Sequence, residues 1–154
     1  MRTPQGFTIV EITITLMVMS VLVSVLFIFV NDSQSRARDK ERQSDIDTLH
    51  ARLGEYYHDF GAYPSSLTAA TFSRLDPAVL IAPNGTTVRN DTPVNNQATA
   101  RVSTDPTASS SQYTYTPYPT SCSNNCVGYI LKAYIERPTA QMPNPYIRGG
   151  VYNN

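Results

Sequence analysis

The feature that most constrains this chain is a long apolar run near its start. From Phe7 to Val30 the sequence contains one ionisable side chain, Glu11, and no Gly or Pro. A helix of this length rises roughly 36 Å at 1.5 Å per residue, which is enough to cross a hydrocarbon core of about 30 Å. The sequence therefore predicts a membrane-spanning helix over residues 7–30.

The charges at the two ends of this run predict its orientation. Arg2 and the free amine precede it, whereas residues 31–34 contain no Lys or Arg. Because positive charge favours the cytoplasmic side, we expect the N-terminus inside and the C-terminal part outside. A secretory signal peptide and a simple signal anchor are the alternatives, although the run exceeds the usual signal-peptide core of about 7–15 residues and ends without an A-x-A-like site.

Glu11 is the unusual residue within the run. A carboxylate there costs about 2.5–3.5 kcal/mol on insertion scales, so such groups are usually paired and functional. No Lys, Arg or His follows until Arg36. The sequence therefore offers no obvious partner for Glu11 within this chain.

The string GFTIVE, from Gly6 to Glu11, resembles the class III signal of type IV pilins and pseudopilins. The resemblance implies that a prepilin peptidase removes a leader, residues 1–6, by cleaving between Gly6 and Phe7, and that the new amine of Phe7 is methylated. It also implies that Glu11 neutralises the terminal amine of a neighbouring subunit as filaments assemble. Two departures are Gln5, where many leaders carry a basic residue, and the absence of the Pro that often kinks the run in major pilins.

Residues 31–60 continue the helix in amphipathic form. Apolar side chains recur at spacings of three and four, namely Ile46, Leu49, Leu53, Tyr56, Tyr57 and Phe60. Gly61 and Tyr63-Pro64 predict the helix end, and with Leu67 they also resemble the exit from the long helix of pilins. We expect an α+β, type IV pilin-like fold: one helix from about Phe7 to Phe60, half transmembrane and half amphipathic, packed on a small antiparallel β-sheet.

The polar side chains of this continuation allow several interpretations. The charged stretch from Arg36 to Arg42 is compatible with a solvated helix face, an intersubunit ion-pair surface or a headgroup-binding collar. His50 and His58 are expected to be surface residues, because no set of metal ligands with the usual spacing accompanies them. The sequence thus predicts no metal site and no cofactor.

Residues 61–154 are expected to form a globular head. A short helix is predicted from Ala69 to Leu75, and period-two alternation predicts strands at Tyr113–Thr116 and Tyr129–Glu136. The stretch 83–112 is rich in Asn, Thr, Ser, Ala and Pro, so we expect a long exposed loop. Three N-x-Ser/Thr triplets, at Asn31, Asn84 and Asn90, mark surface positions.

The only two cysteines, Cys122 and Cys126, lie between the predicted strands. We expect them to form a disulfide across a hairpin loop, since the location argued for this part of the chain is oxidising. A metal pair would need two further ligands, and thioredoxin-like chemistry would need two intervening residues rather than three.

Composition limits the function classes. Twelve basic and twelve acidic side chains give a formal net charge of zero, which argues against nucleic-acid binding by bulk electrostatics. No G-x-S-x-G, H-E-x-x-H or phosphate-binding Gly loop is present, so an enzyme is not expected.

The resemblance implies a structural filament subunit. Its expected partners are like subunits or other pilins, the prepilin peptidase, the membrane, and an assembly platform with its ATPase. A minor pilin, a type II secretion pseudopilin and a non-assembling membrane-anchored adhesin are the alternatives. The acidic calcium loop of some pseudopilins has no counterpart here, because only Glu136 follows Asp105 among the acidic residues.

Overall fold

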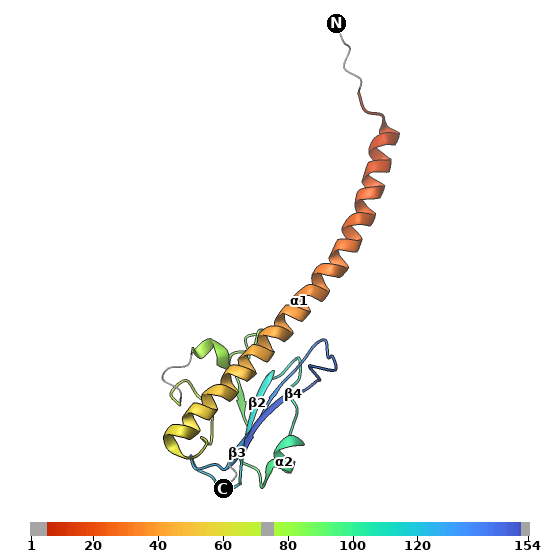
Figure 1. Cartoon of the computed structure of the whole chain (residues 1–154). Helices are drawn as coiled ribbons and strands as arrows, with labels where there is room; N and C mark the ends of the chain where they lie inside the picture. Colours follow the sequence, from red (N-terminus) through yellow and green to blue (C-terminus); the bar gives the residue numbers. More distant parts are fainter. Residues whose placement is uncertain (1–5, 72–75, 152–154) are drawn as a thin grey trace. The chain divides into compact units, whose positions relative to one another are not determined.

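The computed structural model describes residues 6–71 and 76–151 (Figure 1). Its first element is the 52-residue helix α1, Ile9–Phe60. The chain divides into two compact units, with the boundary between Arg36 and Ala37. The elements after α1 are η1 (Pro77–Leu80), β1 (Arg89–Asn90), α2 (Gln97–Arg101), β2 (Tyr113–Tyr118), β3 (Gly128–Ala133) and β4 (Tyr146–Val151).

In the first unit, the described apolar side chains of α1 are exposed. Leu16 and Phe27, for example, are 64% and 66% exposed. Hydroxyl groups in this stretch donate to carbonyl oxygens one turn earlier, as Ser20 does to Met17 and Ser24 to Ser20, each over 2.8 Å. Such bonds satisfy polar side chains without water. Among the described residues, α1 is the one helix long and apolar enough to cross a membrane.

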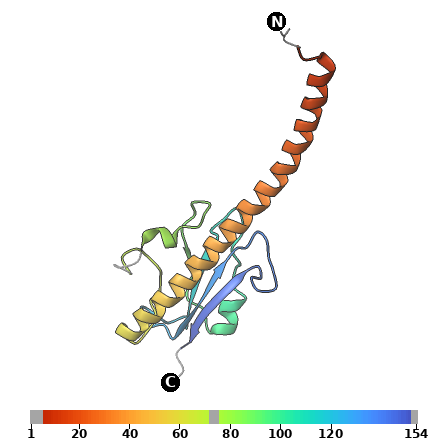
Figure 2. The same ribbon diagram turned by 45° about the horizontal axis from the view of Figure 1, so that its top comes forward.

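The second unit packs the C-terminal part of α1 on a four-stranded sheet in the order β1-β2-β3-β4 (Figures 1 and 2). Strands β2, β3 and β4 form an antiparallel meander. The sheet is mixed rather than purely antiparallel, because β1 pairs with β2 in parallel. The connection from β1 to β2 contains α2 and has the length that a parallel crossover requires.

The core lies between α1 and one face of the sheet. Ile46, Leu49 and Leu53, each fully buried, come from α1. Leu131 and Tyr129 of β3, also buried, belong to the same apolar cluster. Full burial of such a side chain stabilises the fold by about 1.5–3 kcal/mol. The amphipathic pattern therefore predicted the core correctly at Ile46, Leu49 and Leu53. Tyr56 and Tyr57 are only partly buried against it, and the prediction was wrong for Phe60, which is 69% exposed.

The predicted exposed loop over residues 83–112 is only partly a loop. It contains β1 and α2, and its Val88 and Ala100 are buried. Beyond β1, the main chain still bonds to β2, from Asp91 N to Tyr115 O over 2.9 Å and from Val94 N to Pro117 O over 3.0 Å. These are backbone contacts, which a composition of Asn, Thr and Ser cannot reveal.

Strand β4 was not anticipated from the sequence because two of its six residues are Gly149 and Gly150. Both glycines permit close packing. A Cβ on Gly149 would lie 2.7 Å from Ile130 Cδ1, and one on Gly150 would lie 2.7 Å from Tyr129 Cε1 and 2.9 Å from the Tyr63 hydroxyl. The predicted helix over Ala69–Leu75 was placed partly on residues 72–75, which lie outside the described residues; residues 68–71 form a turn.

We expect Gly150→Ala to lower the free energy of unfolding by about 1–3 kcal/mol, because the added methyl group overpacks the tyrosine cluster. Gly54→Ala is the matched control. Gly54 lies on an exposed part of α1 with open space around its Cα, so alanine there should stabilise the protein by about 0.5–1 kcal/mol. Guanidinium unfolding of the full chain in detergent micelles measures both effects, and equal effects of the two substitutions would contradict the packing role of Gly150.

Candidate functional site

The start of α1 carries the residues singled out by the sequence. Gly6 and Phe7 precede the helix and are exposed, Phe7 by 80%. The Thr8 hydroxyl accepts a hydrogen bond from Glu11 N over 3.2 Å and so caps the first turn. Glu11 lies in that first turn, where the helix dipole favours a negative charge. Residues 1–5 of the expected leader lie outside the described residues.

The Glu11 side chain makes no hydrogen bond or ion pair within the part of the chain that the structure describes. The neighbours of Glu11 on α1 are exposed and apolar, including Ile9 at 84% and Val10 at 65%. An anionic carboxylate is costly in an apolar environment unless a cation pairs with it. Glu11 is thus an exposed carboxylate on an apolar stretch of α1, with no paired cation among the described residues.

A second group of polar side chains, within the second unit, joins three buried residues to two partly exposed ones through ion pairs and hydrogen bonds. We call it the clasp, formed by Arg38, Asp39, Arg42, Gln112 and Glu136. Asp39 and Arg42 are 0% and 1% exposed and lie 2.6 Å apart. Arg42 also donates to Glu136 over 2.6 Å and to Gln112 over 3.0 Å. Arg38 binds the same Glu136 carboxylate over 2.6 Å.

The clasp also joins the helix to the backbone that follows β3. Asp39 accepts hydrogen bonds from the amides of Glu136 and Arg137 over 2.9 and 2.8 Å. Each buried charge is thus both paired and hydrogen-bonded, which is the condition for tolerating charge in an interior. The hydrogen bond to Glu136 raises the pKa of the Arg38 guanidinium.

Tyrosine hydroxyls form a second set of contacts between the helix and the sheet. Tyr113 donates to Asp45 over 2.7 Å, and Tyr146 donates to Asp47 over 3.0 Å. Arg148 of β4 also binds Asp47, over 2.7 Å. Burial raises the pKa of the Asp45 carboxyl, and the hydrogen bond from Tyr113 offsets part of that rise. These tyrosines therefore pack their rings in the core and place their polar ends on the helix.

His50 is a member of this set rather than an isolated surface residue. It is half-buried, and its Nδ1 lies 2.8 Å from the Tyr129 hydroxyl. Burial lowers the pKa of His50; Arg148 lowers it further, and Asp47 opposes the shift. His58, by contrast, is exposed, as expected, and lies 3.4 Å from Asp59.

The cysteine pair forms the predicted disulfide. Cys122 and Cys126 are joined in the loop between β2 and β3, with Cα atoms 4.8 Å apart. In the chain-entropy picture, closing a five-residue loop stabilises by about 2 kcal/mol. The bond stands beside the segment that leaves α1, since Tyr63 and Cys126 form an antiparallel bridge.

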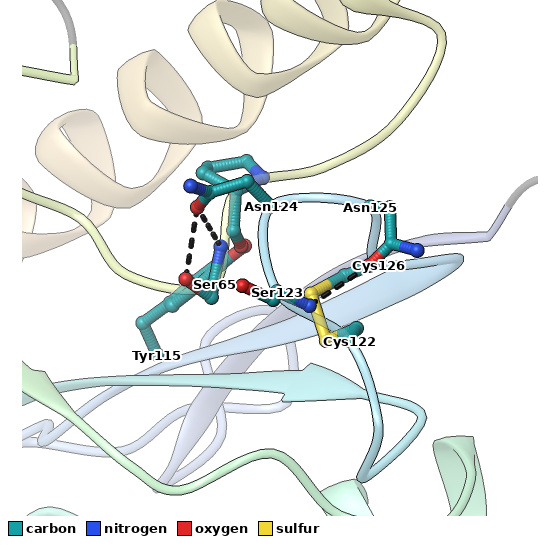
Figure 3. The surroundings of a disulfide bond; sticks show 8 residues. Ser65, Tyr115, Cys122, Ser123, Asn124, Asn125 and Cys126 are labelled. Carbon is teal, nitrogen blue, oxygen red and sulfur yellow. Dashed lines mark hydrogen bonds between the residues drawn. A yellow bond between two sulfur atoms is a disulfide. The ribbon is translucent and has the colours of Figure 1, made fainter.

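The tip of the disulfide loop is fixed by asparagine side chains (Figure 3). Asn124 adopts a positive φ of 64°. Its Oδ1 accepts hydrogen bonds from the Ser65 hydroxyl over 2.9 Å and from Ser65 N over 3.3 Å. Asn125 accepts from Ser123 N over 2.8 Å. The loop is therefore a docked element of the head that holds the helix exit against the sheet.

The structure thus resolves the charged stretch from Arg36 to Arg42 into two kinds of residue. Lys40 and Glu41 are exposed, as a solvated face requires, whereas Asp39 and Arg42 are buried inside the head. Sequence reasoning missed the clasp because its partner carboxylate, Glu136, lies far away in the chain. The one available indication was that Asp39 and Arg42, three residues apart, align with the apolar face that begins at Ile46.

No group of three or more His, Cys, Asp or Glu side chains that could hold a metal ion is found among residues 6–71 and 76–151. Comparison with models of protein families, with curated proteins and with solved structures finds no match to the chain.

We expect Arg42→Met to lower the free energy of unfolding by about 3–5 kcal/mol, because it leaves the buried Asp39 carboxylate without its cation. Arg52→Met is the matched control. The pair of Arg52 with Glu55 is solvent-exposed, so its loss should change stability by less than about 1 kcal/mol. Denaturant unfolding of both variants in micelles measures these losses. Equal losses of unfolding free energy would contradict a stabilising role for the Arg42–Asp39 pair.

His50 should make the head less stable at acidic pH. Its pKa in the folded protein is below the unfolded value of 6.5, so the unfolded state takes up more protons as the pH falls through 6.5, and stability declines. We expect His50→Gln to remove this part of the decline between about pH 8 and about pH 5. Melting temperatures of both proteins across that range provide the measurement, and parallel curves would show that His50 contributes nothing.

Proposed function

We propose that the chain is a structural, non-catalytic subunit of a type IV pilus or related filament. The observation that carries the proposal is Glu11, a carboxylate with no partner among the described residues, on an exposed apolar helix, four residues after Phe7. Cleavage after Gly6 would create a cationic amine at Phe7. That amine on one subunit and Glu11 on its neighbour form the complementary pair that each requires in an apolar environment.

In this proposal, the apolar stretch of α1 lies first in the membrane and then in the filament core. It first holds the subunit in the membrane, where the charge at the N-terminus favours a cytoplasmic start and an external head. It then packs against like helices in the filament core. The disulfide supports the external placement of the head, because such bonds persist in oxidising compartments.

The paired charges of the head support the same division of roles. In the clasp, the carboxylates and guanidinium groups pair with one another within one chain. The charges that α1 contributes to the clasp therefore need no partner subunit to neutralise them. Within the described part of the chain, Glu11 has no paired cation. The proposal therefore assigns assembly to the N-terminal stretch of α1 and the outer surface of the filament to the head.

Several partners follow from this proposal. They are the prepilin peptidase that cleaves between Gly6 and Phe7 and methylates Phe7, other pilin subunits, and a membrane assembly platform driven by an ATPase. A minor pilin or a secretion pseudopilin would use the same processing and the same Glu11 pairing at a lower abundance. A membrane-anchored adhesin would use the helix without cleavage.

We expect Glu11→Ala to reduce the yield of sheared filaments by about 100-fold or more, because breaking a buried pair costs about 3–5 kcal/mol. Glu41→Ala, which removes an exposed carboxylate from the same helix, is the matched control and should assemble normally. Both variants must replace the wild-type copy and must show the mature mass that begins at Phe7. Normal filament yield from processed Glu11→Ala protein would overturn the proposal.

The mature mass also separates the alternatives. A chain that starts at methylated Phe7 in the sheared fraction supports a filament subunit, and its abundance distinguishes a major from a minor one. A processed chain that is absent from filaments favours a pseudopilin. An unprocessed chain confined to the membrane favours the anchored adhesin.

A further inference from the structure

Three N-x-Ser/Thr triplets occur in the chain, and the structure gives them different surroundings. Such a triplet can accept an N-linked glycan only where the asparagine amide nitrogen is accessible and the nearby hydroxyl can be recognised with it. The three asparagines are Asn31, Asn84 and Asn90. Their backbone and hydrogen-bond environments decide which of them meets this requirement.

Asn31 and Ser33 lie inside α1. Residues two apart on a helix point in nearly opposite directions, so the Ser33 hydroxyl does not face the Asn31 amide. The helix would have to unwind locally before the two groups could be recognised together. This first triplet is therefore a poor acceptor.

Asn90 lies at the end of β1, and its amide is already in use. Its Nδ2 donates to Leu67 O over 3.0 Å, and its Oδ1 accepts from Leu67 N over 2.6 Å. Leu67 is 1% exposed and belongs to the core. Attaching a sugar to Nδ2 would break this pairing, so the second triplet is structural.

Asn84 lies at the tip of a tight turn and is exposed. The turn closes on itself through Gly85 N to Ala82 O over 2.7 Å and Ala82 N to Thr86 O over 2.8 Å. The glycine adopts φ of 82°, a conformation that favours this residue type. Exposed loop tips are where proteases most readily reach a folded domain, and a transferase needs the same access to an asparagine side chain.

The Asn84 amide has a defined orientation. Its Oδ1 accepts hydrogen bonds from Thr86 N over 3.1 Å and from the Thr86 hydroxyl over 2.6 Å. Because the Thr86 backbone N–H can only donate, the amide oxygen rather than the nitrogen must face it. The Thr86 hydroxyl donates to the same oxygen and accepts from Gln112 N over 3.3 Å. The planar amide then directs Nδ2 away from Thr86, and within the described residues Nδ2 donates to no acceptor.

We propose that Asn84 is the N-glycan acceptor of this chain, with Thr86 as its recognition hydroxyl. The inference rests on the proposed function in one respect, because it needs the head to lie outside the cytoplasm. The donor would be an oligosaccharide linked to a polyprenyl pyrophosphate. Nδ2 forms a bond to the first sugar carbon, the bond from that carbon to the pyrophosphate oxygen breaks, the lipid pyrophosphate leaves with the electron pair, and one amide proton passes to a base of the transferase.

The test is mass spectrometry of the full chain from its native host, in both the sheared-filament and membrane fractions. We expect the peptide that contains Asn84 to carry an adduct whose fragmentation releases sugar ions. Asn84→Gln and Thr86→Val should each abolish the adduct. Thr86→Ser, which keeps the hydroxyl, and Thr92→Ala, which removes a different triplet at an exposed position and leaves the Asn90 amide paired, should both retain it.

An unmodified Asn84 in the wild-type protein would overturn the inference, as would an adduct that survives Asn84→Gln. The same spectra report separately on the proposed function. A chain that starts at methylated Phe7 in filaments, with Asn84 unmodified, overturns the glycan site alone. An unprocessed membrane chain that carries a glycan on Asn84 supports the site and overturns the filament role.

Discussion

The head depends on how one face of a long helix is held in register on a sheet of tyrosines. Apolar contacts alone specify this register weakly, because Ile46, Leu49 and Leu53 recur every three or four residues. Sliding the helix by one turn, about 5.4 Å, would again place apolar groups on the sheet. Polar contacts remove this degeneracy, since each requires one donor opposite one acceptor. Tyr113 meets Asp45 and Tyr129 meets His50 only in the observed alignment.

Two acidic residues of α1, Asp39 and Glu11, differ in whether the chain supplies a partner for their charge. Asp39 is buried, and the chain itself supplies a guanidinium and two backbone amides to it. Glu11 lies on an exposed apolar stretch, and the described part of the chain supplies no partner to it. Because a carboxylate without a cation is unfavourable in an apolar environment, the arrangement at Asp39 stabilises the head, and under the proposed function the arrangement at Glu11 favours association. Under the proposed function, self-sufficient head charges leave Glu11 as the residue that selects a neighbouring subunit.

The segment between η1 and β2 has a structural role that its polar composition conceals. It adds β1 to the sheet and covers the face opposite α1, where Ala100 packs with Tyr118 and Ile130. The same segment neutralises Lys132, which is fully buried on that face and donates to Asp105 and to the Ser103 carbonyl. Its tip, around Asn84, remains exposed and closes on local hydrogen bonds. This polar segment thus has both buried residues that pack on the sheet and an exposed turn.

The sequence by itself determined the elements that depend on local pattern. The apolar run, the three-and-four spacing of Ile46, Leu49 and Leu53, and the alternation around Tyr129 gave the helix, its core face and two strands, because periodicity reflects burial directly. The only cysteines allowed a single intrachain pairing. Only the tertiary structure decided the rest. It decided the pairing of Arg42 with Glu136, the parallel addition of β1 and the formation of the glycine-rich strand β4. These features depend on contacts between residues far apart in the chain and on close approach of the backbone, which no local pattern encodes.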